Sequence, residues 1–240
     1  MSREQQVGRA FVALSDTLAD DFDPLVLFQR LVDQCASLLA VEGVGVMMRD
    51  ARGTLRTMAA SSEEALLLEL LQLQNNSGPC MECYRRRRSV DVPDLSEERE
   101  RWPEVVPAAL GAGFASMYTV PLRVHAHVLG AVNFFRADRG SLPREDQYLA
   151  QALSDVAALA LMHWSNEPTR PVDVLTRLQS ALAAKAALEI AKGMIAEYGN
   201  VSFVEAARML HEYATGRQVR LTDTVDALIR GDIYPAALLG

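Results

Sequence analysis

Six side chains near the C-terminus have the charge and spacing to contact phosphate groups: Lys185, Lys192, Arg208, His211, Arg217 and Arg220. Lys185 and Lys192 are seven residues apart in an alanine-rich helical pattern, so they share one helix face. Arg208 and His211 are three residues apart and can also share a face. Such a basic stripe suits contact with a nucleic-acid backbone. The alternative is an ordinary solvent-exposed face.

The overall charge makes clustering necessary for any nucleic-acid site. The 240 residues carry a formal net charge of −7, which excludes binding through general basicity. Between residues 172 and 232 there are seven Lys or Arg and eight Asp or Glu residues. A nearly neutral segment binds RNA only if its cations gather on one side.

The three cysteines offer a second kind of chemistry. Cys80 and Cys83 form one C-x-x-C motif, and Cys35 stands alone. An odd, small number of cysteines argues against a disulfide framework. The four histidines supply no second ligand pair at zinc-finger spacing, so buried or half-buried free thiols are favoured over a structural zinc site. A helix beginning at Pro79, or the run Arg85–Arg88, would lower the thiol pKa and make these cysteines reactive.

Hydrophobic periodicity predicts an α+β first region. Helices are expected over residues 3–20, 24–40, 62–74 and 143–164, with Asp23 as N-cap before Pro24. Residues 44–50 and 54–60 read as a β-hairpin, and 115–124 and 127–137 as the strongest strand pair. A short helix from Pro79, an extended piece and a proline-interrupted helix ending at Gly111 or Gly113 lie between them. The order predicts an antiparallel sheet with flanking helices.

The proline-containing segment 166–171 is the predicted linker between a first domain, residues 1–165, and a second domain, residues 172–240. The second domain is predicted to be an all-α three-helix bundle with an elongated first helix, over 172–198. Its second helix begins after Ser202, which forms a capping box with Glu205. Its third helix runs from Leu221 to Gly231.

An apolar stripe on the elongated helix has nothing in its own bundle to cover it. Leu175, Leu178 and Leu182 follow the spacing of a coiled-coil seam. We therefore expect a homodimer held by parallel helices. The alternative is that the stripe packs back onto the first domain.

The first region resembles a GAF domain of the kind found in actinobacterial regulators. The resemblance rests on "SGPC" at 77–80, Tyr84, "VDVPDL" at 90–95, "RWP" at 101–103 and "VLGAVNFF" at 128–135. It implies a sensor domain, often with a small-molecule pocket, but identifies no ligand. The candidate pocket residues are Met47, Cys80, Tyr84, Met117, Thr119 and Phe134. The alternative is that they are ordinary core residues.

Some stand-alone GAF proteins reduce free methionine sulfoxide with cysteines, so a thiol-dependent reductase is one alternative function. The cysteine spacing here does not match that family. The sequence shows no Ser-His-Asp order, paired carboxylates or phosphate loop elsewhere. We therefore expect no enzyme activity.

The second region resembles an ANTAR domain, the RNA-binding module of bacterial transcription antiterminators. The matching pieces are "IAKG" at 190–193, "EAA" at 205–207, Tyr213-Ala214, and Arg220-Leu221 with Asp223. The resemblance implies that RNA contacts come from Lys185, Lys192, Gly193, Arg208, His211, Arg217 and Arg220. Lys185 and His211 replace residues that are commonly arginine in the family.

The resemblance implies a dimer that grips paired hairpins in nascent RNA and thereby prevents a terminator from forming. Tyr213 is expected either to stack on an unpaired base or to pack in the core. The alternatives are a DNA-binding helical regulator and a dimeric scaffold that has lost RNA binding.

The sequence also predicts where the protein is located and what it binds. No run of eighteen apolar residues and no signal-peptide pattern occurs, so we expect a cytoplasmic protein without a membrane partner. The expected partners are RNA, a second copy of the chain and a small-molecule effector, with no metal or other cofactor.

Overall fold

The computed structural model describes residues 2–15, 23–50, 53–163 and 171–239, with the side chains of residues 163 and 171–182 outside that description. Five antiparallel strands form one sheet in the order β2-β1-β5-β4-β3. The strands are β1 Gly43–Arg49, β2 Leu55–Ala60, β3 Val90–Val92, β4 Ser116–Val124 and β5 His127–Arg136. The predicted hairpin and strand pair are both confirmed.

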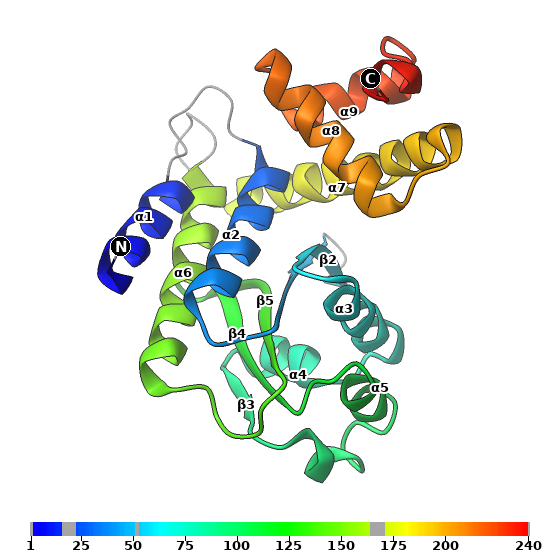
Figure 1. The fold of residues 1–240 in the computed structure, drawn as a ribbon. Helices are drawn as coiled ribbons and strands as arrows, with labels where there is room; N and C mark the ends of the chain where they lie inside the picture. The colour runs from blue at the N-terminus through cyan, green and yellow to red at the C-terminus, as the bar shows by residue number, and fades with distance from the viewer. Residues whose placement is uncertain (1, 16–22, 51–52, 164–170, 240) are drawn as a thin grey trace.

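Helices cover both faces of this sheet (Figure 1). One face is covered by α1 Arg3–Ser15, α2 Pro24–Leu38 and α6 Arg144–His163, and the other by α3 Glu63–Asn75, α4 Pro79–Arg86 and α5 Val105–Gly111. A 3-10 turn, η1 Leu95–Glu98, precedes α5. Consecutive residues of a strand point to opposite faces of the sheet. Because helices cover both faces, the strands bury side chains on both.

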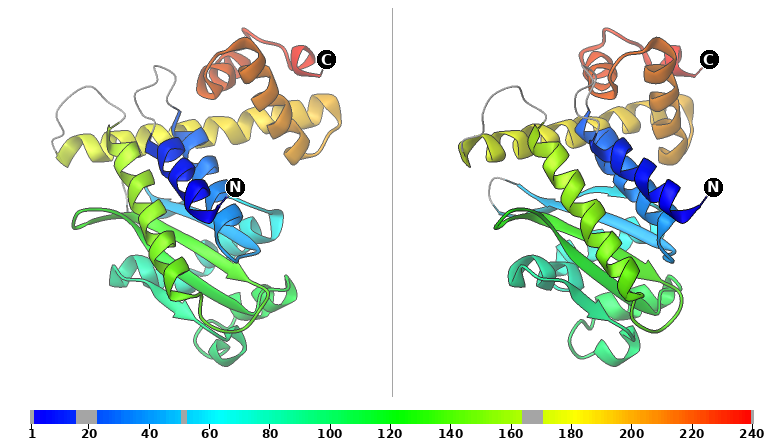
Figure 2. Two further views of the ribbon diagram at one scale, coloured as in Figure 1. Left: turned by 60° about the vertical axis from the view of Figure 1, so that its left-hand side comes forward. Right: turned by 90° about the vertical axis from the view of Figure 1, so that its left-hand side faces the viewer.

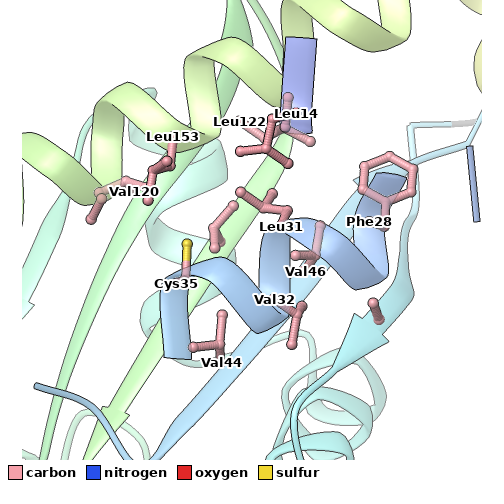
Figure 3. Close-up of a cluster of buried hydrophobic side chains, with 14 of the residues drawn as sticks. Leu14, Phe28, Leu31, Val32, Cys35, Val44, Val46, Val120, Leu122 and Leu153 are labelled. Carbon is pink, nitrogen blue, oxygen red and sulfur yellow. The ribbon is translucent and has the colours of Figure 1, made fainter. Parts of the chain in front are cut away.

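Buried apolar side chains fill the space between the sheet and α1, α2 and α6 (Figure 3). Phe28, Leu31 and Val32 of α2 pack on Val44 and Val46 of β1. Leu153 of α6, Leu14 of α1 and Val120 and Leu122 of β4 join the same cluster. Such fully buried branched side chains each stabilise the fold by about 2 kcal/mol.

Three helices follow the first region: α7 Pro171–Gly199, α8 Phe203–Arg217 and α9 Leu221–Arg230, with the short turn η2 Pro235–Leu238 (Figure 2). They share a hydrophobic cluster that includes Ala191, Ile195, Leu210, Val225 and Leu228. The predicted caps explain where these helices begin and end. Ser202 Oγ accepts a hydrogen bond from Glu205 N at 3.1 Å, and Gly231 ends α9 at a positive φ of 81°.

Several predictions fall outside the described residues. The first helix ends at Ser15, and residues 16–20 of its predicted length lie beyond the description. The predicted linker also lies there, apart from Pro171, which begins α7. The side chains of the seam residues Leu175, Leu178 and Leu182 also lie outside the part of the chain that the structure describes. Among the helices that are described, none is long and apolar enough to cross a membrane.

Candidate functional site

The sheet face under α3, α4 and α5 receives most of the predicted pocket residues. Met47, Cys80 and Met117 lie in its buried cluster, and Tyr84 packs against that cluster half-buried. Phe134 lies apart from them, on the opposite face of the sheet, in the cluster under α2 and α6. On β5 the neighbouring residues Asn133 and Phe135 point toward α3–α5 instead.

A buried polar network crosses this second face. Thr119 Oγ1 donates a hydrogen bond to Asn133 Oδ1 at 2.8 Å, and Asn133 Nδ2 donates to Glu69 Oε1 at 2.5 Å. Glu69 comes from α3 and lies against Gly45 of β1, where a Cβ atom would be 2.3 Å from Glu69 Oε1. The network therefore joins β4, β5 and α3 through side chains alone.

The carboxyl group of Glu69 is fully buried, with 0% of the residue exposed. Burial raises the pKa of Glu69 to about 8, and the hydrogen bond from Asn133 offsets part of that rise. Glu69 is therefore mostly protonated at pH 7, and its carboxyl group can then donate a hydrogen bond.

Several buried hydrogen-bonding groups on the same face have no partner. Within the described part of the chain, the buried side-chain atoms that lack one are Arg49 Nε, Thr57 Oγ1, Glu69 Oε2 and Gln72 Nε2. Arg49 follows Met47 at the next position on that face of β1, and Thr57 is the cross-strand partner of Met47. Buried polar atoms rarely stay unpaired, so this group is a candidate ligand site.

Sequence reasoning missed Glu69, Gln72 and Asn133. The signal was present, since Glu69 and Gln72 interrupt a leucine-rich segment three residues apart. The helix α3 turns these polar residues toward the sheet and leaves Leu67 outside, 64% exposed. Gln72 Oε1 also accepts a hydrogen bond from Cys80 N at 3.0 Å, which ties α3 to the start of α4.

Cys80 and Cys83 are buried free thiols, as the sequence favours. Burial raises the pKa of Cys80 well above its usual value, and nearby Glu69 adds to the rise. Burial and Glu82 raise the pKa of Cys83 to about 12. Desolvation thus outweighs both the helix start at Pro79 and the arginine run. Thiols of this kind stay protonated at neutral pH and are poor nucleophiles.

In the C-terminal region, Glu189 lies between the two lysines of α7 and forms an ion pair with each of them. Lys185 Nζ lies 2.7 Å from Glu189 Oε1, and Lys192 Nζ lies 2.9 Å from Glu189 Oε2. Burial acts to raise the pKa of Glu189, but the two lysines outweigh it and the net shift is downward. Lys192 also lies 5.8 Å from the ring of Phe203, the first residue of α8. The expected shared face is present, with a carboxylate at its centre.

The other predicted cations also have partners inside the chain. Arg208 is paired with Glu205 and Glu212 on α8. Arg220 makes a two-pronged contact with Asp223, at 2.8 and 2.9 Å. The guanidinium of Arg217 lies 4.1 Å from the centre of the Tyr213 ring. His211 is exposed and Gly193 is half-buried.

The residues of the predicted basic stripe therefore lie in separate groups, each of which pairs with nearby residues of the C-terminal region. Among the described residues, no hydrogen bond or ion pair joins the α7 lysine pair to the Arg208 or Arg220 groups. Sequence reasoning missed Glu189, although its spacing of four and three residues from the lysines indicates both ion pairs. It also missed Phe203, an aromatic residue that is 56% exposed beside Lys192.

No group of three or more His, Cys, Asp or Glu residues is placed to hold a metal ion in the part of the chain that the structure describes. His125 lies in the β4–β5 turn at a φ of 52°, and His127 begins β5 on its exposed side. Cys80 Sγ has a sulfur neighbour instead, Met47 Sδ at 3.0 Å.

Comparison with known proteins identifies the first region. The GAF domain family model matches residues 23–161, which is more than half of the chain. No curated protein matches the sequence.

Solved structures agree on the fold. The GAF domain of an Acinetobacter phosphoenolpyruvate-protein phosphotransferase is 16% identical, with a TM-score of 0.53, covering 68% of this chain and 95% of that one. A free methionine-R-sulfoxide reductase from Neisseria meningitidis, solved with its substrate, is 14% identical, with a TM-score of 0.53 and coverages of 68% and 89%. A phosphotransferase GAF domain from Coxiella burnetii is 13% identical, with a TM-score of 0.51 and coverages of 68% and 96%.

At these identities the likeness concerns the fold alone, and it does not transfer the activity of any one neighbour. The five-stranded antiparallel sheet, the helices on both of its faces and the family match nevertheless agree over the same residues. The chain belongs to the GAF domain family.

Proposed function

We propose that this protein is a GAF-domain regulator that binds RNA through α7–α9, as a three-helix domain of the ANTAR type. The single observation that carries the proposal is the placement of Lys185 and Lys192 on one face of a helix, with Lys192 next to the exposed ring of Phe203. Cations beside an exposed aromatic ring suit single-stranded loops, where phosphates and unstacked bases are both within reach.

The ion pairs within the chain are compatible with this role. Exposed pairs between Lys or Arg and a carboxylate contribute only about 0–1 kcal/mol. An RNA phosphate can therefore replace Glu205 and Glu212 on the exposed Arg208 at small cost, whereas replacing Glu189 on the half-buried lysines costs more. RNA binding then depends on several such exchanges together, which predicts a strong dependence of affinity on salt.

The regulatory mechanism follows the sequence resemblance. Two copies, joined along the predicted seam of Leu175, Leu178 and Leu182, would present two RNA-binding regions to paired hairpins. Holding those hairpins would prevent a terminator from forming in the nascent transcript. The homodimer remains a prediction.

The Lys192→Ala variant tests RNA binding directly. We expect it to weaken binding of a hairpin RNA roughly tenfold and to make the salt dependence shallower, because one phosphate contact is lost. Filter binding over a series of salt concentrations measures both quantities. The matched control is Arg139→Ala, which removes a cation paired with Asp94 at 3.2 Å in the GAF domain.

Three results would contradict the proposal. Equal affinities of the wild-type protein and Lys192→Ala for hairpin RNA would remove the assigned site. Tighter binding of duplex DNA than of hairpin RNA would favour the DNA-binding alternative. Absence of binding to both would favour a scaffold that has lost RNA binding.

We also propose that the GAF domain binds a small molecule rich in hydrogen-bond acceptors. Protonated Glu69, Gln72 and Arg49 each carry a buried donor group without a partner, and all three lie on the α3 side of the sheet. A carboxylate, phosphate or carbonyl group would satisfy such donors.

The Gln72→Met variant tests this ligand. Native mass spectrometry of the purified chain should detect a bound small molecule in the wild-type protein and little in Gln72→Met, because the variant removes the Nε2 donor at nearly constant volume. The variant also removes the acceptor of the Cys80 N hydrogen bond, so its circular dichroism spectrum must match that of the wild-type protein. Gln74→Met is the control, since Gln74 is exposed on the same helix. Wild-type protein free of any bound molecule under these conditions, or equal occupancy in Gln72→Met, would contradict the assignment.

A further inference from the structure

One buried carboxylate caps two helices that are far apart in the sequence. Asp23 Oδ1 accepts a hydrogen bond from Leu25 N at 2.8 Å and so caps α2 of the GAF domain. Asp23 Oδ2 accepts a hydrogen bond from Thr222 N at 2.9 Å, in the first turn of α9. Only 5% of Asp23 is exposed, so this bridge is shielded from solvent. The sequence indicates the first cap but not the second.

The helix α9 depends on this external cap. Within the described residues, the side chain of its N-cap Arg220 accepts no hydrogen bond from a backbone N–H of the first turn, whereas Ser202 Oγ, at the N-cap of α8, accepts one from Glu205 N. A cation at a helix N-terminus is also unfavourable, because the helix dipole is positive there. Asp23 supplies the missing acceptor, and its negative charge adds to that of Asp223 in the first turn.

Apolar packing accompanies the shared cap. Leu25 is 6% exposed and lies in the hydrophobic cluster of the C-terminal helices, with Leu221 and Val225 of α9 in the same cluster. Val26 packs against that cluster as well. Figure 2 shows the N-terminal end of α2 meeting the C-terminal helices, while the rest of α2 lies on the sheet. The first turn of α2 is therefore part of the core of the C-terminal region.

The same helix reaches the sheet opposite the candidate ligand site. Phe28 and Val32 of α2 pack with Val44 and Val46 on one face of β1. Met47 of β1 points to the other face, where it contacts Cys80. A ligand that shifts β1 on the α3 side would thus shift the strand on which α2 rests.

We propose that Asp23 and Leu25 form a latch that holds α9, and with it Arg220, against the GAF domain. In the observed closed state, α9 has its cap and Leu25 is buried. In the open state, α2 withdraws, the first turn of α9 loses its cap, and Arg220 becomes free to exchange Asp223 for an RNA phosphate. The latch is a contact within the chain and does not depend on RNA. Only its effect on RNA affinity rests on the proposed function.

Hydrogen exchange of the full chain tests the latch without RNA. In Asp23→Ala, we expect the backbone amides of residues 221–223 to exchange about fivefold faster than in the wild-type protein, because a helix cap is lost. Leu25→Ala, which keeps both cap bonds but removes buried packing, should have the same effect in the same segment. The control is Asp33→Ala, an exposed aspartate on α2 that pairs with Gln29. Wild-type exchange at residues 221–223 in both Asp23→Ala and Leu25→Ala would overturn the latch.

RNA affinity supplies the second measurement. If the latch restrains RNA binding, Asp23→Ala should bind hairpin RNA about fivefold more tightly than the wild-type protein. Faster exchange with unchanged RNA affinity would overturn the regulatory part of the proposal. Faster exchange in a protein that binds no RNA in any form would support the latch and contradict the proposed function, so the two failures can be told apart.

Discussion

Replacing Gly130 by alanine is expected to destabilise the GAF domain by about 3 kcal/mol or more. Gly130 lies on β5 opposite Met48 of β1, where the two central strands are paired. A Cβ atom at this position would be 1.9 Å from the carbonyl oxygen of Met47 and 2.8 Å from the Cα of Met48. Backbone atoms cannot rotate away as a flexible side chain can, so the strands would have to separate. Urea denaturation measures the loss as a lower midpoint.

Gly111→Ala is the matched control for this prediction. Gly111 ends α5, and a Cβ atom there would meet no other atom within 4 Å. We expect the unfolding free energy of this variant to stay within about 0.5 kcal/mol of the wild-type value. Equal urea midpoints for Gly130→Ala and Gly111→Ala would contradict the close approach of Gly130 to the backbone of Met47 and Met48.

Glu69→Gln is expected to remove a pH dependence of stability. The pKa of Glu69 is about 8 in the folded chain against a usual value of 4.5, so the folded state holds a proton that the unfolded state releases. Because the folded state binds more protons in this window, stability is full below the lower pKa and falls as pH rises toward the higher one. The wild-type protein should lose roughly 3 kcal/mol of unfolding free energy between about pH 5 and pH 7 through this group.

Gln resembles the protonated carboxyl group and can still accept the hydrogen bond from Asn133. We therefore expect Glu69→Gln to match the wild-type protein near pH 5 and to exceed it by roughly 3 kcal/mol near pH 7. Urea denaturation at a series of pH values gives the two curves. Glu63→Gln, at the exposed start of the same helix, should keep the wild-type slope. Parallel curves for Glu69→Gln and the wild-type protein would refute the buried, protonated state of Glu69.

The sequence by itself determined the features that depend on neighbouring residues. Asp23 before Pro24, Ser202 before Glu205 and Gly231 after Arg230 mark helix ends at the positions where the structure has them. Alternation and turn residues located the β1–β2 hairpin and the β4–β5 pair. The motifs of the first region identified the GAF family, which the family match confirmed. These signals are local, because caps and turns are set by a few consecutive residues.

Only the tertiary structure decided how the elements face one another. The helical period shows which residues of α3 share a face, but the sheet decides that Glu69 and Gln72 point inward while Leu67 stays outside. The alternation of β5 likewise leaves open which helices cover Phe134. The structure also decides how strongly burial raises the pKa of the Cys80 thiol, since desolvation depends on every atom packed around a group.

Asp23 shows most directly that local sequence patterns do not predict contacts between distant elements. Its partner Thr222 lies 199 residues away in the sequence, so no local pattern connects the two. Spacing within a helix or strand determines which side chains lie together on one element. Contacts between elements depend on how the whole chain packs, and the shared cap, the polar network and the orientation of α3 all arise there.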